Sequence, residues 1–246
     1  MLQGTADPQS LARDAPTLPD FNTEALRLGG VETLQVFCEI ERAGAESLLP
    51  PGLHPTLPPV VTWLVQRITD SPWGPFGLAQ CRIECRSGLR PRGFLRAGFI
   101  DNETAATELA ARWGYILWPG NIALERGYDR SCAQVTTSGE AILDLVMEDP
   151  QPLRAEDAYH VANMHLARTP NGLRLVQVDP DFEVERVERG RPRIRRFDAA
   201  AWNSVGVRPS HPVSALFTVG DVTLPVLRYV CRPDVLAFEG SERVDR

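Results

Sequence analysis

The side chains of this sequence that could do chemistry are few, and the most informative one is absent. All 26 basic residues among the 246 are arginines, so the chain contains no lysine. A desolvated lysine is the usual protein amine for imine formation with a carbonyl substrate, and arginine cannot replace it because the guanidinium keeps its proton. The sequence therefore excludes Schiff-base catalysis by lysine.

Two glutamates on one predicted strand are the candidates for acid–base chemistry. The segment VETLQVFCEIER over residues 31–42 alternates as a strand does, which places Phe37, Glu39 and Glu41 on one face. A carboxylate in apolar surroundings has a raised pKa and can serve as a general acid or base.

Metal and nucleophile sites find little support in the sequence. Cys81 and Cys85 are four residues apart and could be combined with His54, but a tetrahedral site needs a fourth ligand, and no second pair exists. Five cysteines in apolar runs indicate reduced, mostly buried thiols. A serine or cysteine paired with a histidine can assemble across a fold, yet no local pattern indicates one, and structural or surface roles are favoured for the histidines. We therefore expect no metal and no other cofactor.

The elements that must position these residues are mostly strands. Residues 1–25 are rich in proline, aspartate and alanine without periodicity, which predicts an N-terminal arm or a partly disordered tail before a single domain over residues 26–240. The best helix covers residues 103–112, with Asn102 as its N-cap and Glu103 near the positive end of its dipole. Many short strands with few helices predict an α+β fold with an antiparallel sheet or barrel.

Charge and hydropathy exclude two classes of partner. A net charge of −6 and a pI near 5.3 argue against nucleic acid, since binding phosphates needs a cationic excess. The one basic cluster, residues 186–196, is interleaved with glutamates, which favours a salt-bridged strand pair over an anion site. No apolar run approaches the roughly 18 residues that span a bilayer, and no signal peptide is visible, so we expect a soluble, cytoplasmic protein without a membrane partner.

Four segments in order resemble one known family. LLPPGL (48–53), WGPFGLAQCRIE (73–84), GFLRAGFIDNETA (93–105) and RWGYILWPGNI (112–122) resemble successive segments of acetoacetate decarboxylase and its superfamily. GRPRIRRFDAAAWNS and VTLPVLRYV resemble its C-terminal strands, so that the resemblance covers roughly residues 30–235. It implies a curved antiparallel sheet that closes into a barrel-like cone around a buried pocket, usually in a homo-oligomer. It also implies an imine between an active lysine and a ketone, assisted by a second lysine, an arginine and two glutamates.

The positions implied by this resemblance carry different residues here. The paired lysines fall at Leu117 and Trp118, one glutamate at Leu78, the other at or near Trp63, and the arginine near Glu39. The chain is therefore expected to be a divergent member that lacks the Schiff-base lysine. The resemblance implies that one apolar cavity brings together Trp63, Leu78, Leu117 and Trp118, joined by Phe37 and Phe76. Glu39 and Glu41 are then expected as the carboxylates that enter it.

Three interpretations of this cavity follow. The first is a biosynthetic enzyme of secondary metabolism that cyclises (in the sharpest form by a pericyclic reaction), isomerises or dehydrates a hydrophobic, polyketide-like substrate, with Glu39, Tyr115 and Gln80 supplying acid–base or hydrogen-bonding help. The second is a binding protein without catalysis, in which Glu39 pairs with Arg67 or Arg96. The third is a cavity filled by side chains. A cavity of several hundred cubic ångströms with Glu39 facing it would separate the first two from the third.

Overall fold

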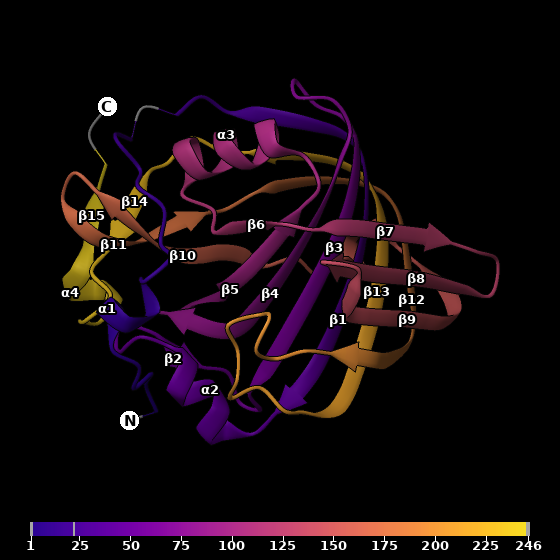
Figure 1. The fold of residues 1–246 in the computed structure, drawn as a ribbon. Coiled ribbons are helices and arrows are strands. Elements are labelled where there is room, and N and C mark those ends of the chain that lie inside the picture. The colour runs from indigo at the N-terminus through magenta and orange to yellow at the C-terminus, as the bar shows by residue number, and fades with distance from the viewer. Residues whose placement is uncertain (1, 22, 245–246) are drawn as a thin grey trace.

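A long, strongly curved sheet forms most of the protein. The computed structural model describes residues 2–21 and 23–244, and within them fifteen strands join one sheet (Figure 1). The strands are β1 (Leu26–Ile40), β2 (His54–Pro55), β3 (Val60–Asp70), β4 (Phe76–Ser87), β5 (Arg90–Ile100), β6 (Leu117–Pro119), β7 (Asn121–Arg126), β8 (Arg130–Thr137), β9 (Glu140–Leu153), β10 (Ala162–Thr169), β11 (Gly172–Val178), β12 (Asp181–Phe197), β13 (Pro209–Leu224), β14 (Tyr229–Cys231) and β15 (Ser241–Arg243). The helices are α1 (Pro8–Leu11), α2 (Arg42–Leu48), α3 (Glu103–Trp113) and α4 (Ala237–Gly240), with a 3₁₀ turn η1 (Ala155–Asp157). The predicted α+β class, with a curved sheet and few helices, is confirmed.

The strand order places β1, β3 and β4 at the centre. The hydrogen-bonded path is β15-β14-β11-β10-β5-β4-β3-β1-β13-β12-β9-β8-β7, with β2 added beside β4 and β6 beside β5. The pairs of β5 with β10 and with β6 are parallel, and the other pairs are antiparallel. The path runs from an edge at β15 to an edge at β7, so the barrel-like shape comes from curvature of the sheet.

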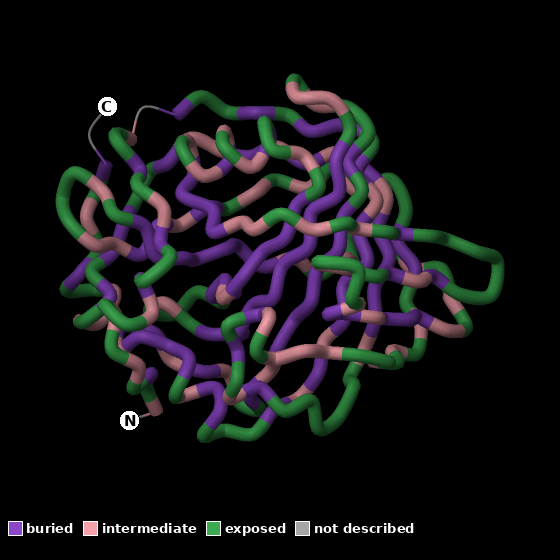
Figure 2. Tube along the Cα trace, viewed as in Figure 1, coloured by how far each residue is buried: buried purple, intermediate pink, exposed green. Residues whose placement is uncertain are grey.

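The central strands are buried on both faces (Figure 2). On one face, here called the apolar face, Val36, Trp63, Val65, Cys81 and Ile83 belong to the larger of two hydrophobic clusters. On the other, here called the polar face, β1, β3 and β4 alternate to present hydrogen-bonding and charged side chains: Thr33, Gln35, Thr62, Gln66, Gln80, Arg82 and Glu84. All seven are at most 8% exposed. Burial of so many polar groups requires that they bond to one another.

Helix α3 begins and ends where the sequence predicts it to within one residue. Asn102 accepts a hydrogen bond from the Ala105 amide at 3.0 Å, and Gly114 ends the helix in the left-handed conformation with φ of 73°. Its apolar side chains Ala105, Leu109 and Trp113 join the second hydrophobic cluster. The helix thereby delivers Tyr115, two residues after its end, to the polar face.

The N-terminal arm packs on the domain along its described residues, whereas Met1 and Asn22 lie outside them. Ala12 and Leu18 are fully buried, and the Leu18 amide donates to the Arg168 carbonyl at 2.8 Å. The described residues of the arm thus contact the domain through isolated apolar side chains, and such residues give no periodic signal.

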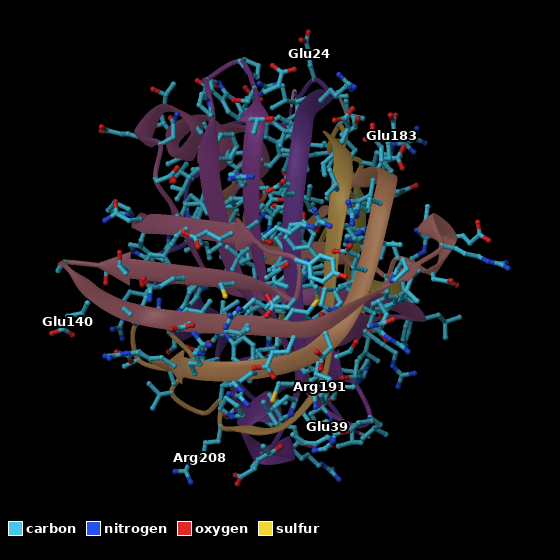
Figure 3. All side chains as sticks on the ribbon, turned by 90° about the vertical axis from the view of Figure 1, so that its right-hand side faces the viewer. Glu24, Glu39, Glu140, Glu183, Arg191 and Arg208 are labelled. Atoms are coloured by element: carbon cyan, nitrogen blue, oxygen red, sulfur yellow. The ribbon has the colours of Figure 1, made fainter. Side chains whose placement is uncertain are left out.

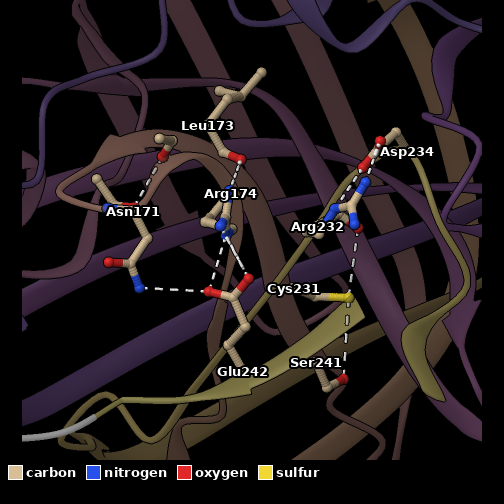
Figure 4. A network of polar contacts seen from close by, with 10 residues as sticks. Asn171, Leu173, Arg174, Cys231, Arg232, Asp234, Ser241 and Glu242 are labelled. Atoms are coloured by element: carbon tan, nitrogen blue, oxygen red, sulfur yellow. Dashed lines mark hydrogen bonds and ion pairs between the residues drawn. The ribbon is translucent and has the colours of Figure 1, made fainter. Parts of the chain in front are cut away.

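The C-terminal strand β15 is tied to the sheet by charged side chains (Figure 4). Arg174 on β11 donates to Glu242 on β15 at 3.1 Å, and Asn171 also reaches this carboxylate. Arg232 forms a separate ion pair with Asp234 at 2.8 Å.

None of the described helices has the length and apolar character needed to span a bilayer.

Candidate active site

A buried arginine is at the centre of the polar face. Arg82 is 2% exposed and donates to Asn163 Oδ1 at 2.9 Å, to Gln35 Oε1 at 3.0 Å and to the Val161 carbonyl at 3.5 Å. Its Nε finds no hydrogen-bond partner among the described residues. Burial lowers the pKa of this arginine, and the nearby Glu84 opposes that effect. The guanidinium nevertheless stays charged because its ordinary pKa is so high.

The amide of Asn163 links this arginine to Tyr115 and Gln80. Its Nδ2 lies 3.1 Å from the Tyr115 hydroxyl and 3.3 Å from Gln80 Oε1. Burial raises the pKa of Tyr115 to about 12, so this phenol is neutral at physiological pH. Gln80, Tyr115 and Asn163 therefore hold one another and Arg82 in fixed positions.

Two histidines flank the network, and both are neutral at pH 7. The ring of His165 packs 4.9 Å from that of Tyr115, and its Nε2 lies 2.7 Å from the Trp113 carbonyl. The ring of His160 stacks on Phe182 with centroids 3.8 Å apart. Burial lowers the pKa of each to about 4, with a further lowering of the His160 pKa by the charge of Arg82.

Glu84 is the buried carboxyl of the polar face. It is 5% exposed and accepts a hydrogen bond from the Thr62 hydroxyl at 2.7 Å. Burial raises the pKa of Glu84, although the charge of Arg82 and the bond from Thr62 act in the opposite direction. A buried carboxyl of this kind can serve as a general acid or base.

Two spaces of very different size adjoin these groups. The inner cavity holds only about 30 Å³ and is enclosed by Leu64, Leu78, Gln80, Arg82, Tyr115, Asn163 and neighbouring apolar residues. The outer pocket has a volume of about 730 Å³ and opens to solvent. Its walls are Phe37, Thr56, Leu57, Pro58, Val60, Glu84, Leu153, Asp157, Tyr159, Arg189, Val213, Ser214 and Leu216. Glu84 is thus the buried acid–base group that faces a space large enough for a small molecule.

The structure brings together some of the residues expected at the site. Leu78, Gln80 and Tyr115 line the inner cavity, and Phe37 lines the outer pocket. Phe37 also lies 6.1 Å from Tyr159, measured between ring centroids. The predicted site therefore divides between two neighbouring spaces on the polar face.

Four other residues do not converge with them, and this part of the expected cavity is wrong. Trp63 pairs in register with Val36 and packs 4.9 Å from Phe197 on the apolar face. Trp118 packs on the cluster of that same face, beside Phe99. Leu117 and Phe76 belong with the second cluster and line other hollows. Successive residues on a strand point to opposite faces, so Trp63 points to the apolar face while Thr62 and Leu64 point to the polar face.

The two glutamates predicted on β1 lie away from both spaces. Glu39 is half-buried near the end of β1, and Figure 3 shows it at the lower end of the sheet, while Glu41 is the exposed N-cap residue of α2. Neither lines the outer pocket or the inner cavity. The pairing imagined for a binding protein is also absent, since Arg67 bonds to Glu32 and Arg96 to the Asn203 carbonyl. The buried carboxyl on the wall of the outer pocket is Glu84 and not Glu39.

The sequence contained a signal for the residues that were missed. Gln80, Arg82 and Glu84 alternate with Cys81, Ile83 and Cys85 along β4, which is a period of two with polar side chains on one face. An alternating strand is usually exposed on its polar side, and nothing local reveals that this side is covered. Gln35 and Asn163, the partners of Arg82, come from distant strands and have no sequence signal.

Comparisons with known proteins agree with this architecture. The model of the acetoacetate decarboxylase family matches residues 10–232. An acetoacetate decarboxylase structure superimposes with a TM-score of 0.75 at 18% identity, covering 84% of this chain and 89% of its own. The acetoacetate decarboxylase of Legionella pneumophila subsp. pneumophila str. Philadelphia 1 gives 0.72 at 19% identity, covering 83% and 86%. The enduracididine biosynthesis enzyme MppR, complexed with pyruvate, gives 0.67 at 18% identity, covering 84% and 90%. A comparison with curated proteins finds no significant match.

Proposed function

We propose that this chain, which belongs to the acetoacetate decarboxylase family, is an enzyme that cyclises, isomerises or dehydrates a hydrophobic small molecule without forming an imine. The observation that carries the proposal is Glu84, a buried carboxyl with a raised pKa on the wall of a pocket of about 730 Å³. The absence of lysine removes the imine route. A proton-transfer role for Glu84 is the chemistry that remains available at this wall.

The geometry suits proton transfer at carbon next to a carbonyl. An ionised Glu84 would take a proton from that carbon, the C–H electron pair would form the new C=C bond, and the carbonyl electrons would move onto oxygen. The oxygen electrons would then re-form the carbonyl, the new C=C bond would shift by one position, and the electrons of the substrate's neighbouring C=C bond would take the proton back from Glu84 at its far carbon. This shift of the double bond completes an isomerisation. Tyr159 lines the same pocket and offers a phenol as a hydrogen-bond donor, since burial raises its pKa. One structural neighbour, MppR, is described with bound pyruvate and as a biosynthetic enzyme, which is consistent with a carbonyl ligand in secondary metabolism.

The role of Arg82, Gln80 and Tyr115 in this proposal is to shape the electrostatic surroundings of Glu84. Arg82 is the main charged neighbour of Glu84. Its positive charge favours the ionised carboxylate and so opposes the rise in pKa that burial causes. The inner cavity of about 30 Å³ has room for a water molecule but not for a substrate. Tyr115 therefore acts in this proposal through Asn163 and Arg82.

A second candidate, a binding protein without catalysis, is favoured by one observation. Arg82, Asn163, Gln80 and Tyr115 bond to one another, which is what a structural network does as well. In that case the outer pocket would hold an apolar ligand, and Glu84 would only contribute polarity. The two candidates differ in whether Glu84 exchanges protons with a bound ligand.

Proton exchange decides between these candidates. The purified protein is incubated in D₂O with a panel of apolar β,γ-unsaturated ketones, and isomerisation and deuterium uptake are followed by ultraviolet absorbance and mass spectrometry. We expect turnover by the wild type and a loss of about 100-fold or more in Glu84→Gln, since a general acid–base group typically contributes that much. The rate of the wild type should still rise with pH above the ordinary range of glutamate, because a raised pKa means that Glu84 ionises only at higher pH.

The control is Glu39→Gln, which removes a carboxyl from the same sheet but outside the pocket. It should leave the rate unchanged. Turnover that survives Glu84→Gln would contradict the acid–base role and would favour catalysis by the shape of the pocket alone. Binding of the ketones without exchange in the wild type would favour the binding protein.

A further inference from the structure

One arginine on the wall of the outer pocket has no partner. Arg189 on β12 is exposed, and no ion pair or hydrogen bond joins its side chain to the described residues. Its neighbours along the strand are engaged in ion pairs: Arg186 with Glu188, Arg191 with Asp149 and Arg193 with Glu148. The salt-bridged strand pair expected for this basic segment is thus present around Arg189 but does not include it.

Arg189 and Glu84 lie on different walls of one pocket. Glu84 is on β4 and Arg189 on β12, with β3, β1 and β13 between them. Four strand spacings of about 4.8 Å and an offset of four residues along the strands, at about 3.3 Å each, give about 23 Å along the sheet. Curvature of the sheet shortens the distance across the pocket. The wall between them is formed by Val60, Phe37 and Leu216, each from one of the intervening strands. A ligand lying along this wall would meet a carboxyl at one end, apolar side chains along its body and a cation at the other end.

We infer that the outer pocket selects an amphipathic acid, with an apolar body over Phe37 and Leu216, a carboxylate at Arg189 and the neutral reacting group at Glu84. This inference rests on the proposed function and adds the class and orientation of the substrate. The reverse orientation would place two carboxyl groups together in apolar surroundings, which is unfavourable. At Arg189 the carboxylate stays partly hydrated and can accept two parallel hydrogen bonds from the guanidinium.

Besides Glu84 and Arg189, the described lining holds one more charged residue, Asp157 on η1. It is exposed. Asp157 would repel a ligand carboxylate weakly at the rim. Its removal should therefore strengthen the binding of an acid and leave the binding of a neutral ligand unchanged.

Competition with an uncharged dye tests the inference. Nile red is bound to the full-length protein and displaced with dodecanoate or with dodecan-1-ol, which share the apolar chain and differ in charge. In the wild type we expect dodecanoate to bind more tightly than the alcohol. Arg189→Gln should weaken dodecanoate by about three- to tenfold, as for a partly exposed charge-assisted contact, and change the alcohol by less than twofold. Asp157→Asn should strengthen the binding of dodecanoate and leave the binding of dodecan-1-ol unchanged.

Arg195→Gln is the matched control, because Arg195 is exposed on the same strand and does not line the pocket. It should change neither affinity. Equal displacement by acid and alcohol, or equal effects of Arg189→Gln and Arg195→Gln on dodecanoate, would overturn the inference. So would a failure of both ligands to displace the dye. None of these results concerns proton exchange with neutral ketones, so the role of Glu84 is decided separately.

Discussion

His165 should make the protein markedly less stable in mild acid. Its ring is fully buried and has one hydrogen bond, from Nε2 to the Trp113 carbonyl at 2.7 Å, while Nδ1 has no partner. Burial lowers the pKa of His165 from 6.5 to about 4. Below pH 6.5 the unfolded chain therefore binds a proton that the folded protein resists, and stability falls as the pH falls from about 6.5 to about 4.

The size of this effect follows from the pKa difference. At pH 5.0 the unfolded histidine lies 1.5 pH units below its own pKa, while the folded one is still largely neutral. At about 1.4 kcal/mol per unit, the free energy of unfolding is lowered by about 2 kcal/mol relative to pH 7.5. Carboxylates elsewhere also titrate in this range, so the wild type alone cannot isolate His165.

The replacement His165→Gln isolates it. The glutamine amide can still donate to the Trp113 carbonyl but does not titrate, so the variant should lose less stability on acidification. Urea unfolding at pH 7.5 and at pH 5.0 gives the free energy of unfolding of both proteins. We expect acidification to pH 5.0 to lower the free energy of unfolding of the wild type by about 2 kcal/mol more than that of the variant. An equal loss of stability in both proteins would refute the burial of a neutral imidazole at this position.

Two further predictions concern packing on the two faces of the sheet. Gly93→Ala should lower the free energy of unfolding, measured in urea, by about 1–3 kcal/mol. The added Cβ would lie only 3.0 Å from Arg82 Cδ and 3.2 Å from Arg82 Nε. An unchanged midpoint of urea unfolding would mean that Arg82 moves aside freely. Trp63→Ala should cost about 3–5 kcal/mol in the same assay, since the indole is fully buried against Phe197. If the variant remains folded, its affinity for Nile red should match the wild type, and a selective loss of dye binding would place Trp63 at the pocket after all.

Local patterns were sufficient to predict the elements but not the faces of the sheet. The N-cap at Asn102 and the alternation over residues 31–42 have causes within a few residues, and both α3 and β1 formed as these causes require. The segment around Trp63 is apolar at nearly every position because both faces of β3 are buried. Alternation cannot assign a face to such a strand. The family resemblance alone puts Trp63 at the cavity, whereas its register with Val36 puts it on the opposite face.

Side chains fill most of the space at the inner cavity. Leu78, Leu64 and the Tyr115–Asn163–Arg82 network reduce it to about 30 Å³. Leu117 packs instead over Gly98 on β5, where an added Cβ would be only 2.6 Å from Leu117 Cδ2, and it lines another hollow. The inner cavity is therefore too small for a ligand larger than a water molecule.

The outer pocket, of about 730 Å³, is the space that Glu84 and Arg189 line. Arg82 connects it with the inner cavity, since Arg82 bonds to the network there and is also the main charged neighbour of Glu84. In the proposed function, this network holds a cation behind the carboxyl and would thereby influence the pH at which Glu84 exchanges a proton. Disturbing the network at Gly93 should consequently shift the pH dependence of any reaction that Glu84 carries out, even though Gly93 lines neither space.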